Sequence, residues 1–367
     1  MGSGAISFDL SAFAGKRVLL TGDSGFKGSW LALWLCELGA DVTGLSLPCT
    51  SANVLFPEVA PLIRHLDGDI RDLGIVQRTM KEVQPDFVFH LAAQPLVRQS
   101  YIDPQSTIAT NVLGSTNLLE AVRTTDGIRA LVFITSDKCY RNREWTWGYR
   151  ENDELGGRDP YEVSKACAEL ILQAYRDSFF QGRGGFGAAS ARAANVIGGG
   201  DRAADRIIPD AISALEAGRP VVLRNPNSIR SWQHVLEPLF GYLRLAVGLA
   251  QDPQRFSGAW NFGPGYDALR SVEELARAVL SAWGSGEIRY QIDQDAPHEA
   301  KILHLSSEKA RAELGWETLW SFERTSAETV AWYRAVHAGH SAAETARNQI
   351  HAYMAERTRI GAELVGH

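Results

Sequence analysis

The chain has 367 residues, of which 45% are hydrophobic, so it can bury a full core, and the disordered and fibrous classes are excluded. Its 37 Lys and Arg residues against 43 Asp and Glu residues give a net charge of −6 without a dense basic block, so nucleic acid is not an expected partner. The longest apolar runs, such as residues 30–36, are much shorter than the roughly 20 residues of a membrane-spanning helix, so no membrane partner is expected.

The cysteines and the first residues bear on where the protein works. The four cysteines lack the CxxC spacing of a zinc site, and a chain of this length needs no disulfide framework. Residues 1–4 carry neither the basic nor the apolar region of a signal peptide. We therefore expect a cytoplasmic protein without a metal site.

Short apolar runs alternate with amphipathic segments in the first half of the chain. The predicted strands are residues 17–21, 41–45, 63–66, 87–91 and 130–135. The predicted helices are residues 29–38, 73–83 and 107–123, and a further helix at 161–180 leads into a strand at 188–193. Nearly continuous apolar strands are typical of a parallel sheet covered on both faces. The alternation predicts an α/β fold of the Rossmann type, with a doubly wound parallel sheet.

The pattern changes after Asn195. Further elements are predicted as a helix at 207–217, a strand at 221–223, a helix at 235–249, a strand at 259–262, and a helix that Ser271 and Glu274 cap at its start. The expected domains are a dinucleotide-binding Rossmann domain of residues 12–195 with returning segments at about 235–265, a smaller C-terminal α/β substrate-binding lobe of residues 196–338, and a helical tail of residues 339–367. We expect the tail to lie at the periphery or at an oligomer contact.

A glycine-rich turn joins the first predicted strand to the first predicted helix. Gly22, Gly25 and Gly28 are spaced so that the backbone can turn tightly and approach a pyrophosphate, which the helix N-terminus would bind. The alternative is an ordinary strand–helix turn, but its place in a strand–helix–strand pattern favours dinucleotide binding. Asp23 is unexpected beside a pyrophosphate, because its charge is unfavourable there unless the side chain points away or caps the helix.

The sequence leaves the type of dinucleotide open. An acidic residue at the end of the second strand would bind the ribose of NAD, but residues 44–48 contain none. Arg64 and His65, near the third strand, are either surface charges or ligands of the 2′-phosphate of NADP. Asp69 follows that strand and either meets the adenine or caps the next helix. NAD is expected, and NADP is not excluded.

Three residues form a candidate catalytic set. Tyr161 and Lys165 are four residues apart at the start of a helix, so both project from one face. A lysine beside a tyrosine is expected to lower the pKa of the phenol, which then serves as a base for an alcohol. Ser136, directly after the fifth strand, could bind the same substrate oxygen. A YxxxK pair alone would fit a solvated helix face, but the three residues together behind the glycine turn are specific.

These residues resemble the extended short-chain dehydrogenase/reductases that act on nucleotide sugars, over about residues 15–336. Longer strings are similar to the CDP-glucose 4,6-dehydratases. The segments similar to these dehydratases are residues 25–31, 136–140, 144–151, 195–201, 232–239 and 298–300. Residues 22–28, 90–93 and 135–138 belong to the resemblance to the wider superfamily. Where the family has His-Thr this chain has Asp23-Ser24, and Ala194 and Ser231 also depart from the pattern.

The resemblance implies roles for individual residues. The catalytic residues would be Ser136, Asp137, Lys138, Tyr161 and Lys165. The cofactor-binding residues would be Gly22, Gly25, Phe26, Gly28, Asp69, Ile70, Leu91, Ala92, Ala93, Thr110, Thr135, Tyr161 and Lys165. The substrate-binding residues would be Gln94, Asn195, Arg230 and His298. His234 is a weaker candidate, because a single histidine is more often structural.

The resemblance also implies a reaction, the dehydration of CDP-glucose without net oxidation. Asp137 would be the acid at the C6 hydroxyl and Lys138 the base at C5, with the alternative that Lys138 is only an ion-pair partner of Asp137. A nucleotide-sugar 4-epimerase would not need this pair, and a non-catalytic NAD-sensing or purely structural protein would have no reason to keep the catalytic set. A homodimer or homotetramer is expected, since helices 107–123 and 161–180 commonly form dimer contacts in this superfamily.

Overall fold

The computed structural model describes residues 8–49, 53–291 and 302–365, with side chains up to residue 360. Its centre is a seven-stranded sheet in the order β10-β6-β5-β4-β1-β2-β3, in which every neighbouring pair is parallel. The strands are β1 (Arg17–Thr21), β2 (Asp41–Ser46), β3 (Arg64–Asp67), β4 (Phe87–His90), β5 (Ala130–Ile134), β6 (Gly187–Ala193) and β10 (Gly258–Phe262). The predicted Rossmann-type parallel sheet is confirmed.

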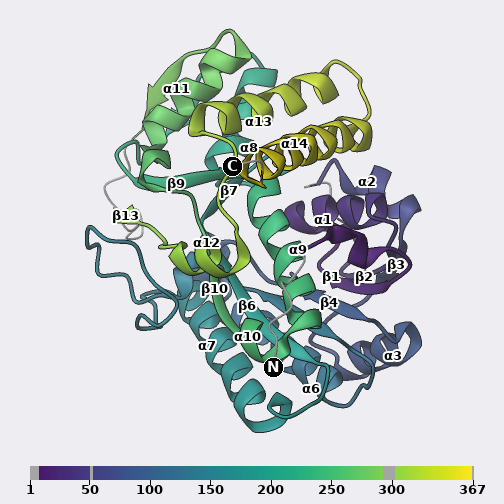
Figure 1. The fold of residues 1–367 in the computed structure, drawn as a ribbon. Helices are drawn as coiled ribbons and strands as arrows, with labels where there is room; N and C mark the ends of the chain where they lie inside the picture. The colour runs from purple at the N-terminus through teal and green to yellow at the C-terminus, as the bar shows by residue number, and fades with distance from the viewer. Residues whose placement is uncertain (1–7, 50–52, 292–301, 366–367) are drawn as a thin grey trace.

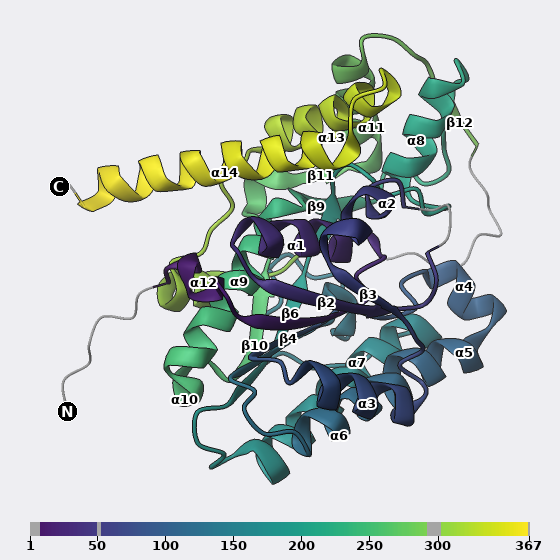
Figure 2. The same ribbon diagram turned by 90° about the vertical axis from the view of Figure 1, so that its right-hand side faces the viewer.

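Helices cover both faces of the sheet, as Figure 2 shows. One face carries α1 (Phe26–Glu37) and α9 (Leu236–Gln251), and the other carries α3 (Leu73–Val83), α6 (Ser115–Arg123) and α7 (Pro160–Tyr175). Because apolar side chains alternate along each strand, the sheet separates two hydrophobic clusters. Trp30 and Trp34 of α1 are both buried, because this helix also packs against the C-terminal helix.

Two predicted helices are not regular α-helices throughout. The predicted helix 107–123 consists of α5 (Pro104–Ile108), a π-helical segment η3 (Ala109–Gly114) and α6. The predicted helix 161–180 ends as α-helix at Tyr175 and continues as a π-helical segment, η5 (Arg176–Phe180). A π-helical turn inserts an extra residue into the helix, which periodicity alone does not reveal, and such turns are frequent at functional sites.

A smaller lobe lies beyond the carboxyl ends of the strands (Figure 1). In its main sheet β9 (Ile229–His234) pairs in parallel with β7 (Asn195–Ile197) and β13 (Ile302–Leu303), and antiparallel with β11 (Leu269–Ser271). A second sheet pairs β8 (Val221–Leu223) with β12 (Ile288–Tyr290). The helices of the lobe are α8 (Ile207–Glu216), α11 (Val272–Trp283) and α13 (Phe322–His337). The predicted capping box of Ser271 and Glu274 is present at the start of α11.

Short helical elements complete the chain. They are η1 (Leu10–Phe13), α2 (Phe56–Val59), η2 (Ala60–Leu62), α4 (Val97–Ile102), η4 (Asp137–Cys139), α10 (Pro253–Phe256), η6 (Tyr266–Ala268) and α12 (Glu308–Leu314). In the described part of the chain, none of the helices has the length and apolar character needed to cross a membrane.

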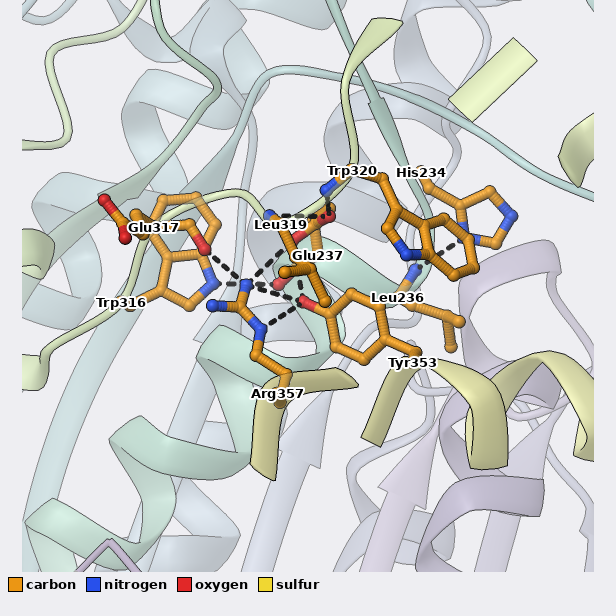
Figure 3. A network of polar contacts seen from close by, with 9 residues as sticks. All are labelled: His234, Leu236, Glu237, Trp316, Glu317, Leu319, Trp320, Tyr353 and Arg357. Carbon is orange, nitrogen blue, oxygen red and sulfur yellow. Dashed lines mark hydrogen bonds and ion pairs between the residues drawn. The ribbon is translucent and has the colours of Figure 1, made fainter. Parts of the chain in front are cut away.

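The C-terminal helix α14 (Ala342–Val365) is anchored by a buried polar network, which Figure 3 shows. Its inward face adds Ile350 and Tyr353 to the same hydrophobic cluster as α1. The Tyr353 hydroxyl and the Arg357 guanidinium both donate to the carboxylate of Glu237, at 2.6 and 3.0 Å. Glu237 is fully buried in the first turn of α9, so the tail is joined to a helix of the main sheet.

Candidate active site

The turn after β1 is shaped so that glycine alone fits at two positions. Gly22 has a φ of +78°, and a Cβ atom there would lie 2.6 Å from the backbone nitrogen of Ala92. A Cβ atom at Gly28 would lie 2.0 Å from the Gly22 carbonyl oxygen. Gly25 is the N-cap of α1, and no side chain caps this helix. The helix N-terminus can therefore receive an anion on its backbone N–H groups, which fits the pyrophosphate of a dinucleotide.

Asp23 points away from this anion site. Its carboxylate is fully buried and contacts the imidazole of His65 on β3, with 2.6 Å between Oδ2 and Nδ1. The space it occupies lies over Gly44, where a Cβ atom would be 2.0 Å from Asp23 Oδ2. Burial raises the pKa of Asp23, and the hydrogen bond to His65 opposes that rise. The residue that looked unfavourable in the sequence is thus a partner of a histidine 42 residues away.

The two cations considered for a 2′-phosphate both have acidic partners. Arg64 forms an exposed ion pair with Glu82, and His65 contacts Asp23 and Asp67. Neither side chain is therefore held ready for a phosphate group.

Asp69 does not cap the helix that follows it. It accepts hydrogen bonds from the backbone and guanidinium of Arg71. The residue that caps α3 is Asp72, which accepts from the backbone of Ile75. The alternative reading of Asp69 as a helix cap is therefore wrong.

The exit of β4 packs directly onto the glycine turn. The backbone nitrogen of Leu91 donates to the Thr21 carbonyl at 3.0 Å, and that of Ala92 donates to the Thr21 hydroxyl at 3.3 Å. Ala93 follows in the same loop. His90 is buried between the Thr21 and Ser115 hydroxyls, and burial lowers its pKa to about 3, so it is uncharged at neutral pH.

The other predicted cofactor residues line the neighbouring elements. Phe26 is the first residue of α1, and Thr110 is half-buried in η3. Ile70 is buried against Gly114 of η3. Thr135 lies at the end of β5, where its hydroxyl donates to the buried carboxylate of Glu169 on α7.

Ser136 and Asp137 form the centre of the candidate catalytic site at the carboxyl end of β5. Ser136 caps η4, and its hydroxyl donates to Asp137 Oδ1 at 2.9 Å and accepts from the Lys138 backbone at 3.2 Å. The other carboxylate oxygen of Asp137 is buried and has no hydrogen-bond partner among the described residues. Burial raises the pKa of Asp137, although Lys138, Ser136 and Arg230 lower it in part.

Tyr161 and Lys165 lie together at the start of α7, which Asp159 caps and Pro160 opens. Both side chains are buried, and the Lys165 ammonium lies 5.9 Å from the centre of the Tyr161 ring. Burial raises the pKa of Tyr161 to about 12, and a hydrogen bond with Ser136 opposes this rise. Burial lowers the pKa of Lys165 to about 8. The expectation of a lowered phenol pKa is wrong for this structure, because desolvation is the larger effect.

The structure distributes the predicted substrate residues unevenly. Arg230 on β9 is buried, its guanidinium donates to the Ile229 carbonyl at 2.8 Å, and its charge lowers the pKa of Asp137. Asn195 is half-buried on β7, beside Trp232 of β9. The side-chain amide of Gln94 is bonded to Leu96 in its own loop and to Thr107 on α5. His298 lies outside the described residues.

His234 is a structural residue in this fold. It is fully buried, and its ring packs edge-on to Trp30 and against Trp320, with centroid distances of 5.9 and 4.7 Å. Burial lowers its pKa to about 3, so it is uncharged at neutral pH.

Two residues of the site had no signal that sequence reasoning could use. Asn111 is buried in η3, and its amide joins the Gln94 backbone to the Ser164 hydroxyl on α7, one residue before Lys165. Arg206 precedes α8, forms an ion pair with Asp201, and lowers the pKa of Tyr161 through its charge. The Asn111 contacts join segments that are far apart in sequence, and the charge of Arg206 acts on Tyr161 from another distant segment.

Comparison with known proteins agrees with this site. The profile of the GDP-mannose 4,6 dehydratase family matches residues 19–329. The chain belongs to this family. Members are nucleotide-sugar dehydratases by name, and a CDP-glucose 4,6-dehydratase of Salmonella typhimurium is 46% identical over 357 residues, which cover 96% of this chain and 99% of that protein.

The solved structures that resemble this chain include both dehydratases and epimerases. An epimerase of Methanothermobacter thermautotrophicus has a TM-score of 0.78 and 26% identity, covering 89% of this chain and 94% of that one. A dTDP-glucose 4,6-dehydratase of Streptomyces venezuelae, solved with NAD bound, has a TM-score of 0.74 and 27% identity, covering 87% and 97%. The fold therefore does not separate the two activities, and the site must.

Proposed function

We propose that this protein is an NAD-dependent nucleotide-sugar 4,6-dehydratase that converts CDP-D-glucose to CDP-4-dehydro-6-deoxy-D-glucose. The observation that carries the proposal is the pair Asp137-Lys138 directly after Ser136, at the carboxyl end of β5, where doubly wound sheets place their sites. Asp137 is a buried carboxylate, one oxygen of which has no hydrogen-bond partner among the described residues, and its charge raises the pKa of Tyr161. The 46% identity to the Salmonella CDP-glucose 4,6-dehydratase supports the choice of nucleotide.

The glycine turn fits NAD. The backbone of Gly22, Gly25, Phe26 and Gly28 would hold the pyrophosphate. The remaining cofactor contacts would come from Asp69, Ile70, Leu91, Ala92, Ala93, Thr110, Thr135, Tyr161 and Lys165. When bound, NAD would supply the acceptor for the C4 hydride and the donor that returns this hydride to C6. The acidic partners of Arg64 and His65 favour NAD over a dinucleotide with a 2′-phosphate.

Tyr161 is the proposed base for the C4 hydroxyl. Because burial disfavours its phenolate, the phenolate must be stabilised by the Lys165 ammonium and by the hydrogen bond with Ser136. Tyr161, Lys165 and Ser136 therefore act as one unit in moving the first proton.

The elimination of water is assigned to Asp137 and Lys138. Asp137 would protonate the leaving C6 hydroxyl, and its raised pKa favours the protonated form that this role needs. Lys138 would remove the C5 proton, and C5 would be protonated again as the hydride reaches C6. In the alternative, Lys138 only balances the charge of Asp137.

The sugar nucleotide would be held from the second lobe. Arg230 offers paired donors to the diphosphate, and Asn195, His298 and Gln94 complete the proposed substrate contacts. The amide of Gln94 is bonded to Leu96 in its own loop and to Thr107 on α5, so its contribution would come from holding that loop rather than from direct contact with the substrate.

A nucleotide-sugar 4-epimerase is the second candidate, because the chain also resembles the Methanothermobacter epimerase in fold. Purified protein should be incubated with CDP-, UDP-, GDP- and dTDP-glucose, and the alkaline enone absorbance of 4-keto-6-deoxy sugars should be followed. We expect a signal with CDP-glucose that needs only catalytic NAD. Formation of the C4 epimer without the enone signal would establish the epimerase instead.

We also propose that the protein forms a homodimer or a homotetramer. Exposed large apolar side chains gather on α4, η3, α7 and η5, and they include Tyr101, Ile102, Leu113, Leu170 and Phe179. A second copy would remove these side chains from water. Light scattering at micromolar concentration tests the proposal, and a monomer would refute it. A cytoplasmic location stays a prediction from the sequence.

A further inference from the structure

Lys27 is a charged residue of the glycine turn to which neither the sequence pattern nor the proposed mechanism gives a role. It is the second residue of α1 and is half-buried. Its ammonium group lies 5.8 Å from the centre of the Tyr242 ring on α9. Among the described residues, the structure gives this ammonium group no hydrogen bond and no ion pair.

Charged groups from three other elements face Lys27. They are Lys165 of α7, Arg206 before α8, and Asp137 of η4. Arg206 is paired with Asp201, so three cations meet two anions here, and one oxygen of Asp137 lacks a partner among the described residues. The remaining positive charge in this half-buried place is unfavourable unless an anion is bound there.

We propose that Lys27 is a further binding residue of the active site and that its ammonium group binds a diphosphate. The inference rests on the proposed function, which supplies two diphosphates, that of the dinucleotide and that of the nucleotide sugar. Lysine binds phosphate as a point charge. The backbone N–H groups at the N-terminus of α1 would bind an anion whatever the side chain of residue 27 is. The ammonium group of Lys27 adds its charge to this backbone site.

Binding at Lys27 is expected to be coupled to proton uptake. Burial, with the charges of Lys165 and Arg206, lowers the pKa of Lys27 to about 7, so part of the population is uncharged just above that pH. A bound diphosphate favours the ammonium form and draws a proton from solvent. Lys165, whose pKa is about 8, adds to this uptake, so the contribution of Lys27 must be measured as a difference between variants.

Isothermal titration calorimetry in two buffers of different ionisation enthalpy measures both affinity and proton uptake. Inorganic pyrophosphate, NAD and CDP-glucose are titrated into the wild type, Lys27→Met, Lys27→Arg and the control Lys81→Met, which changes an exposed lysine of α3. In Lys27→Met we expect pyrophosphate and at least one of the two nucleotides to bind about ten- to hundredfold more weakly, with reduced proton uptake. Lys27→Arg should keep most of the affinity, and Lys81→Met should match the wild type.

The outcomes separate the sources of the diphosphate. Weaker binding of NAD alone assigns Lys27 to the dinucleotide, and weaker binding of CDP-glucose alone assigns it to the nucleotide sugar. Unchanged affinities in Lys27→Met, or equal losses in Lys27→Met and Lys27→Arg, would overturn the proposal, the second because packing rather than charge would then matter. Failure of the proposed function is distinguishable, because the wild type itself would then bind NAD but not CDP-glucose.

Discussion

Two buried carboxylates, Asp137 and Glu237, show how this molecule separates chemistry from stability. Both side chains are almost or fully inaccessible to solvent, and burial raises the pKa of both. They differ in their partners. Glu237 accepts from the backbones of Leu319 and Trp320 and from the side chains of Tyr353 and Arg357 (Figure 3). Asp137 has one oxygen bonded to Ser136 and one without a partner in the described residues.

This difference in partners indicates the role of each carboxylate. A buried charge with a full set of donors joins elements together, and here it joins α9, the segment before α13 and α14. A buried oxygen without a partner lowers stability, so its presence suggests that a ligand supplies the missing donor. We read Glu237 as structural and Asp137 as functional, and the following variants test that contrast.

The largest effect is expected from Asp137→Asn. The amide keeps the shape but cannot donate a proton to the leaving hydroxyl, so dehydration should slow by about 10²–10⁴. The free energy of unfolding should not fall, because a poorly solvated carboxylate is removed. Steady-state kinetics and urea unfolding of the same preparation measure the two quantities. A loss of stability without a loss of rate would reverse the assignment.

Lys138→Ala tests whether the neighbour of Asp137 acts chemically. If Lys138 is the C5 base, C4 oxidation persists while elimination slows by about 10²–10⁴-fold. Reduced dinucleotide should then accumulate when CDP-glucose is added, and solvent deuterium should enter C5 more slowly. Near-normal dehydration in this variant would make Lys138 a charge partner of Asp137 only.

Glu237→Gln should instead affect stability. The change leaves the Arg357 guanidinium without its carboxylate, and breaking a buried pair in this way costs about 3–5 kcal/mol. The turnover of the folded enzyme should stay near that of the wild type. Glu344→Gln, at an exposed position on α14, the helix that carries Arg357, is the matched control and should change little. Equal unfolding midpoints for both variants would show that the network does not anchor α14.

The parts of this site that are local in sequence were predictable. The glycine turn adjoins its strand and helix, and Tyr161 and Lys165 share a helix face through their spacing. Ser136 could be placed because the carboxyl ends of parallel strands meet at one edge of the sheet. In each case local geometry determines which groups come together.

The contacts that join distant segments were not predictable. The amide of Asn111 reaches residues 17 and 53 positions away from within the π-helical segment η3. The docking of α14 was hidden because its buried face has few large apolar residues besides Ile350 and Tyr353. Its anchor is a polar network, which hydrophobic periodicity does not detect.

The smallest expected effect is on the pH dependence of the free energy of unfolding, which tests the contrast between Asp137 and Glu237. The folded-state pKa of Asp137 is raised above its ordinary value of 3.8, so its stabilising contribution is complete below that value and is lost as pH rises through the folded pKa. In Asp137→Asn the side chain does not titrate, so the free energy of unfolding does not show this loss. The free energy of unfolding of the variant minus that of the wild type should therefore increase as pH rises from 3.8.

Urea unfolding midpoints at a series of pH values measure this difference, which should level off once Asp137 is ionised in the folded state. The control is Asp126→Asn, in the exposed loop before β5, which measures the effect of the same substitution at the surface. A difference that falls with rising pH would mean that the folded protein stabilises the Asp137 carboxylate. Asp137 would then resemble Glu237 in having partners that compensate its charge, and the contrast between the two residues would fail.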